Sequence, residues 1–150
     1  MKVGDVCNRV VIHVNADESA QRAAELMRKY HVGYLVVADS GDADRVPIGT
    51  VTDRDIVLEA VAPGIAASDI TVGDIMDPDP PLVADEMDEL ADTLDAMRRQ
   101  GVRRVPVVDA RRTLVGVLAL DDVLQLLSSE LNAIAELASN QRRHEVKVRA

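Results

Sequence analysis

The fold of this chain is decided by the stretch Gly49-Thr50-Val51-Thr52-Asp53-Arg54-Asp55-Ile56, which returns further along as Gly116-Val117-Leu118-Ala119-Leu120-Asp121-Asp122-Val123. In both copies a short apolar run leads into a polar segment that carries aspartates. This pattern is typical of a buried strand that is followed at once by a helix. Repetition of such a stretch is the mark of a duplicated supersecondary unit. The sequence therefore predicts two copies of one unit.

Three further matches occur in the same order in both copies. They are Val3-Gly4-Asp5-Val6 with Val72-Gly73-Asp74-Ile75, Met27-Arg28 with Met97-Arg98, and Leu35-Val36-Val37 with Val105-Pro106-Val107. The first copy carries the longer connection between its last two matches, from Ser40 to Ile48. Four matches in one order are hard to obtain by chance, so the duplication extends over most of the chain.

Each copy has the pattern β-α-β-β-α. In the first copy we expect an extended stretch from Val10 to Val14, a helix capped by Asp17 or Ser19, strands at Tyr34 to Ala38 and Ile48 to Thr52, and a helix from Asp53. In the second we expect an extended stretch at Leu82-Val83, strands at Arg104 to Val108 and Thr113 to Leu118, and a helix from Asp121. A unit of about 65 residues is marginal alone. We therefore expect one α+β body, with repeats at residues 1–65 and 66–128 and a helical extension at 129–150.

Composition sets limits on partners and compartment. The chain has 150 residues, of which 47% are hydrophobic and 29% charged, as in an ordinary globular protein. The formal net charge of −9 repels a phosphate backbone, so nucleic acid is not an expected partner. The single cysteine, Cys7, excludes a disulfide framework within the chain and a multi-cysteine zinc site. No apolar run is long enough to cross a bilayer, and we expect a cytoplasmic protein with no membrane partner.

The duplicated pattern resembles the cystathionine-β-synthase (CBS) domain family in its tandem-pair form, as found in stand-alone proteins. The resemblance is carried by glycine, an apolar residue, Thr or Ser, two variable positions and aspartate, here within Gly49 to Asp55, and by the strand Val105 to Asp109. It covers Val3 to Leu127. It implies a pseudo-twofold module with two clefts that hold an adenosine-containing ligand such as AMP, ADP, ATP or S-adenosylmethionine. It implies no further cofactor.

The first copy offers candidate contacts for such a ligand. Thr52 lies where a strand meets a helix, so its hydroxyl and nearby amides suit a phosphate. The carboxylate of Asp55 can accept hydrogen bonds from both ribose hydroxyls, and Arg54 suits a phosphate. Gly49 allows backbone or ligand to approach closely. The spacing Thr52-x-x-Asp55 is also that of a helix capping box, and both roles can hold at once.

The second copy departs from the motif. Ala119 supplies no hydroxyl, whereas Asp122 keeps the carboxylate. Arg103 and Arg104 can supply phosphate charge or be solvated surface arginines, and Tyr34 can stack on an adenine ring or belong to the core. The sequence predicts two unequal clefts, of which the first copy's is the better candidate.

A heptad-like seam follows the second copy. Its residues are Leu124, Leu127, Leu131, Ile134 and Ala138. The spacing favours packing against a second subunit, hence a homodimer, or against the module's own surface. We expect a regulatory sensor with an unidentified protein partner. The alternatives are a ligand-free scaffold, which Ala119 and the seam favour, and an enzyme, for which no nucleophile with a base and no acid–base pair can be located.

Overall fold

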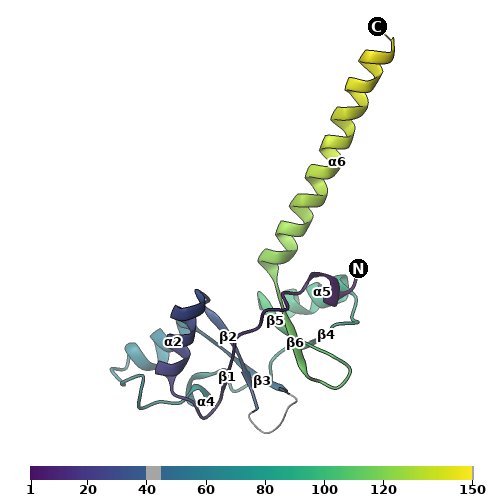
Figure 1. Cartoon of the computed structure of the whole chain (residues 1–150). Coiled ribbons are helices and arrows are strands. Elements are labelled where there is room, and N and C mark those ends of the chain that lie inside the picture. Colours follow the sequence, from purple (N-terminus) through teal and green to yellow (C-terminus); the bar gives the residue numbers. More distant parts are fainter. Residues whose placement is uncertain (40–44, 150) are drawn as a thin grey trace.

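The computed structural model describes residues 1–39 and 45–149, and its elements occur in the same order twice (Figure 1). The first half comprises α1 (Val3–Val6), β1 (His13–Asn15), α2 (Ala20–Tyr30), β2 (Tyr34–Ala38), β3 (Pro47–Thr52), α3 (Asp53–Ile56) and the π-helical turn η1 (Val57–Val61). The second comprises α4 (Val72–Ile75), β4 (Ala84–Asp85), α5 (Leu90–Gln100), β5 (Arg104–Val108), β6 (Leu114–Ala119) and α6 (Leu120–Arg149). The predicted α+β fold is confirmed. Most of the longer connection predicted at Ser40 to Ile48 lies outside the described residues.

Each half contains a three-stranded sheet with the same topology. β1 runs parallel to β2, and β2 runs antiparallel to β3; β4, β5 and β6 repeat this arrangement. The central strands β2 and β5 have the predicted bounds. Their continuous apolar runs are buried because each central strand has a neighbour on both edges and helices over the sheet.

The first strand of each sheet starts later than the sequence predicts. Of the stretch from Val10 to Val14, only the last part joins β1, and the stretch at Leu82-Val83 precedes β4 rather than forming it. Val10 is 76% exposed. The physical reason is that these apolar residues belong to connectors that run between the two halves, and an extended connector has the same apolar pattern as a short strand. The third strand of the second copy is likewise displaced by one residue, to Leu114–Ala119.

The two halves exchange their first helices. The buried side chains of α1 and the residue after it, Val3 and Cys7, belong to the second core, with Leu90 and Leu118. The buried side chains of α4 belong to the first core. That core consists of Val14, Ala20, Ala23, Leu26, Met27, Leu35, Val37, Val51, Ile56, Val72 and Ile75. Neither core is complete without a helix from the other half, which explains why the two marginal units form one body.

Equivalent backbone hydrogen bonds hold both exchanged helices. The N–H of Gly4 donates to the carbonyl of Glu86 at 2.9 Å, and the N–H of Gly73 donates to the carbonyl of Ala16 at 2.8 Å. These two bonds are related by the sequence repeat, since Gly4 and Gly73 occupy the same place in the Val-Gly-Asp motif. The Val-Gly-Asp motif therefore marks the place where each half is hydrogen-bonded to the other.

The motif glycines of β3 and β6, Gly49 and Gly116, lie against the residues that follow the exchanged helices. A Cβ on Gly116 would lie 2.7 Å from Sγ of Cys7 and 3.0 Å from the carbonyl oxygen of Asn8, and a Cβ on Gly49 would lie 2.7 Å from Sδ of Met76. At Gly49 the close approach is therefore made by a side chain of the same chain. Burial raises the pKa of the Cys7 thiol, which fits a small buried apolar residue better than a nucleophile.

We expect Gly116→Ala to lower the free energy of unfolding by about 1–3 kcal/mol, because the added methyl meets backbone that cannot move freely. Asn8 and Val117 exchange two backbone hydrogen bonds of 2.9 Å at this point. The matched variant Gly49→Ala should lose less, since the flexible Met76 side chain can move aside. Urea unfolding of both variants measures the difference. Equal losses would show that the Asn8 backbone does not resist the methyl group.

The last helix is longer than predicted and undivided. α6 begins at Leu120, one residue before the predicted start, and runs to Arg149 without a break at residue 129. Figure 1 shows it projecting away from both sheets. Val123 is its buried residue. Of the helices in residues 1–39 and 45–149, none is long and apolar enough to cross a membrane.

Candidate functional site

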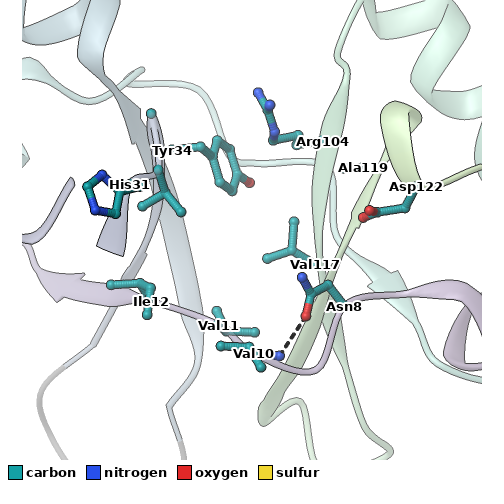
Figure 2. Close-up of a pocket in the computed structure, with 12 residues that line it drawn as sticks. Asn8, Val10, Val11, Ile12, His31, Tyr34, Arg104, Val117, Ala119 and Asp122 are labelled. Atoms are coloured by element: carbon teal, nitrogen blue, oxygen red, sulfur yellow. Dashed lines mark hydrogen bonds between the residues drawn. The ribbon is translucent and has the colours of Figure 1, made fainter. Parts of the chain in front are cut away.

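Two unlike residues meet where the halves face each other. Tyr34 is the first residue of β2, and Arg104 is the first residue of β5, so the repeat makes them equivalent. The guanidinium carbon of Arg104 lies 5.7 Å from the centre of the Tyr34 ring, a cation–π contact (Figure 2). The pseudo-twofold axis therefore passes between an aromatic residue and a cation.

A cavity of about 260 Å³ opens beside this pair, between the two halves. Its walls are Asn8, residues 10–12, residues 31–34, Arg104, Val117, Ala119 and Asp122. We call it the Asp122 cleft. The connector between α1 and β1 supplies its apolar wall, and the junction of β6 with α6 supplies its acidic side (Figure 2). Because the connector runs from one half to the other, both halves contribute to this cleft.

The hydroxyl of Tyr34 is buried at this cleft and has no hydrogen-bond partner among the described residues. Burial raises the pKa of Tyr34, and the Arg104 guanidinium opposes part of that rise, so the phenol stays protonated. A buried hydroxyl without a partner costs about 1–3 kcal/mol. The sequence left open whether Tyr34 is a core residue or a ligand contact. The structure places Tyr34 in the cleft wall, with its hydroxyl buried and unpaired.

Asp122 lies in the first turn of α6, and its carboxylate points into the cleft (Figure 2). No hydrogen bond or ion pair joins it to another residue in the described part of the chain. The helix start has no capping box: Ala119 has no hydroxyl to accept the N–H of Asp122, and the Asp122 carboxylate does not accept the N–H of Ala119. The carboxylate of Asp122 is therefore available to a ligand.

The equivalent aspartate of the first copy is engaged. Oδ2 of Asp55 accepts the N–H of Thr52 at 2.8 Å, and Oγ1 of Thr52 accepts the N–H of Asp55 at 3.2 Å. The capping box that the spacing allowed is thus present at the start of α3. It uses the Thr52 hydroxyl and one oxygen of Asp55, the two groups that the sequence favoured for a ligand.

A second cavity, of about 310 Å³, is bordered by Arg104 but not by Tyr34. It is lined by Thr50, Asp77, residues 79–82, Gln100, Val102, Arg104 and Pro106. We call it the Thr50 cleft. It does not reach Thr52 or Asp55, and Arg104 is the cation among the residues that line it. One guanidinium therefore borders both clefts.

The structure brings together some of the site residues predicted from the sequence and leaves others outside the two clefts. Tyr34, Arg104 and Asp122 come together in the Asp122 cleft. Arg54 is exposed on α3, and Arg103 is 70% exposed with its guanidinium 3.3 Å from the carboxylate of Asp121. Neither lines a described cavity.

Sequence reasoning missed the apolar wall of the Asp122 cleft. Val10 and Val11 line it together with Asn8, whereas the sequence predicts an extended stretch from Val10 to Val14 and gives Asn8 no role. The side chain of Asn8 accepts the N–H of Val10 at 2.9 Å, which turns the connector toward the cleft (Figure 2). An asparagine two residues before an apolar run is the signal for this turn.

We expect Tyr34→Phe to raise the free energy of unfolding by about 1 kcal/mol, because it removes a buried hydroxyl that has no partner. Tyr30→Phe is the matched control, since Tyr30 is 45% exposed; the stability of this variant should not change. Urea unfolding without ligand measures both. A loss of stability in Tyr34→Phe would contradict an unpaired hydroxyl in the free protein.

Comparison with known proteins identifies the family. The family model described as the CBS domain matches residues 3–62 and residues 72–129. The chain belongs to the CBS domain family. The two matched segments coincide with the two halves that exchange α1 and α4, so this CBS domain pair is a tandem repeat in sequence and in structure.

Two curated relatives match most of this chain. Hypoxic response protein 1 of Mycobacterium tuberculosis is 34% identical over 123 residues, which cover 82% of this chain and 82% of that protein. An uncharacterized protein of Methanopyrus kandleri is 32% identical over 126 residues, or 84% of this chain. The chain spans 62% of the length of that second relative.

Solved structures have the same fold. The crystal structure of Hypoxic Response Protein I, with two coordinated zinc ions, matches with a TM-score of 0.72 at 30% identity, over 83% of this chain and 98% of that one. A CBS domain protein from Pyrobaculum aerophilum complexed with AMP has a TM-score of 0.72 at 24% identity, with coverages of 85% and 99%. The CBS domain pair of protein MJ0100, in complex with 5′-methylthioadenosine and S-adenosyl-L-methionine, has 0.73 at 24%, with 87% and 98%. In the described part of this chain, no three His, Cys, Asp or Glu side chains are grouped to hold a metal ion.

Proposed function

We propose that this CBS domain pair is a non-enzymatic regulatory sensor that binds an adenosine-containing ligand in the Asp122 cleft. The observation that carries the proposal is the carboxylate of Asp122, which has no partner among the described residues and faces a cavity that both halves line. Support comes from two proteins of the same fold, one solved with AMP and one with 5′-methylthioadenosine and S-adenosyl-L-methionine. AMP, ADP, ATP and S-adenosylmethionine are the candidate ligands.

The lining of the Asp122 cleft suits the parts of such a ligand. Asp122 can accept hydrogen bonds from both ribose hydroxyls, each contributing about 1.5–3 kcal/mol. The apolar side chains of Val10, Val11 and Ile12 offer a surface for the purine ring. Arg104, whose guanidinium lies 3.8 Å from the carboxylate of Asp121, can hold a phosphate, and the Tyr34 ring adds to the apolar lining.

The exchanged helices supply a route from ligand to regulation. The Asp122 cleft is built from both halves, and each half is completed by a helix of the other. A ligand that touches both halves favours the arrangement in which they are closest, which is a shift of populations. An unidentified protein partner that contacts both halves would sense that arrangement.

We assign the first copy a secondary role. Gly49, Thr52, Arg54 and Asp55 would contribute to a second site only if the ligand shares Asp55 with the capping box. Arg103 would contribute charge near the cleft only after leaving Asp121. The alternative function is a ligand-free scaffold, which the exposed apolar residues of α6 favour.

The test is calorimetric titration of nucleotide-stripped protein with AMP, ADP, ATP and S-adenosylmethionine. For the ligand that binds, we expect Asp122→Ala to lose two charge-assisted bonds, about 3 kcal/mol or roughly a hundredfold in affinity. The pseudo-symmetric control Asp55→Ala should lose stability through its helix cap and retain most of its affinity. Unchanged affinity in Asp122→Ala would overturn the proposed site. Failure of all four ligands to bind would favour the scaffold.

Because Arg104 borders both clefts, two anionic ligands compete for one guanidinium. We therefore expect one AMP per chain at moderate concentration, and a second bound far more weakly. In Arg104→Gln, AMP and uncharged adenosine should bind with similar affinity, whereas the native protein should prefer AMP roughly tenfold or more. The same titrations measure both quantities. Two equal AMP sites per chain would refute competition for Arg104.

A further inference from the structure

The outer part of α6 has an apolar stripe that nothing in the described chain covers. Every residue at positions 128–149 is exposed. Leu131 and Ile134, at 67% and 65% exposure, continue the stripe that Leu124 and Leu127 begin, at 54% and 52%. A helix draws most of its stability in water from packing of its apolar face. Because α6 projects away from both sheets (Figure 1), its apolar stripe requires a packing partner other than these sheets.

The charges of α6 are separated along its length. Its first two thirds carry acidic residues, namely Asp121, Asp122, Glu130 and Glu136. Its last third is basic apart from Glu145, with Arg142, Arg143, Lys147 and Arg149. Two parallel copies of this helix would place like charges side by side. Two antiparallel copies instead place the basic C-terminal third of one helix beside the acidic N-terminal part of the other.

We propose that α6 pairs in antiparallel orientation with α6 of a second copy of this chain. The seam residues are separated by three and four residues in turn, so they alternate between the two core positions of a heptad. In an antiparallel pair, each of these positions faces the other one on the second helix. In that register Leu131 packs against Ile134 of the second copy, and Leu127 packs against Ala138. Arg142 of one helix then lies beside Asp121 of the other. The 30-residue helix spans about 45 Å, which is long enough for such a pair.

Light scattering at micromolar concentration tests the pairing, in the absence of any nucleotide. We expect the native protein at twice its 16.2 kDa mass and Leu131→Asp at the single mass. The matched control Ser129→Asp places the same charge on the opposite face of α6 and should remain dimeric. Because position 131 lies outside both cores, urea unfolding of the body should not change. A monomeric native protein, or a dimeric Leu131→Asp, would overturn the proposal.

Disulfide formation between single-cysteine variants tests the orientation. A mixture of Leu127→Cys and Ala138→Cys should yield the mixed dimer on mild oxidation, and Leu127→Cys alone should give little cross-linked product. Native Cys7 is buried, so the unmodified protein is the background control. Efficient linkage of Leu127→Cys to itself would instead show a parallel pair. Neither experiment involves a ligand, so their outcome is independent of the proposed sensor function.

Discussion

The reciprocal exchange of α1 and α4 is the constraint on which the rest of the structure depends. Each sheet buries its apolar face only with a helix from the other half, and the same backbone hydrogen bonds fix both helices. The exchange forces each connector to run from one half to the other. Those connectors form walls of the two clefts, so the clefts are a consequence of how the cores are completed.

The candidate function lies where the two halves differ. A perfect duplication would place two identical residues at the axis, but here Tyr34 faces Arg104. The aromatic residue brings an unpaired buried hydroxyl to one cleft, and the single cation serves both. Such a molecule keeps a symmetric frame for stability, and the unlike residues at the axis make its two clefts unequal.

The two aspartates of the repeated motif have different surroundings in the two copies. Thr52 binds Asp55 in a capping box, which stabilises the start of α3. Ala119, in the equivalent position, has no hydroxyl, and the carboxylate of Asp122 forms no capping box but points into a cavity (Figure 2). The copy that departs from the motif, and that the sequence disfavoured, is therefore the one whose carboxylate faces a cavity without a partner among the described residues.

The sequence alone determined the duplication, the α+β fold class, the family and the bounds of β2 and β5. These follow from local periodicity and from repeated motifs, which need no knowledge of distant contacts. Only the tertiary structure decided where β1 and β4 begin, which core each first helix completes, and which aspartate is available in a cleft. Each of these depends on contacts between residues far apart in the chain, because an extended connector and a strand, or a capping aspartate and a binding aspartate, have the same local pattern.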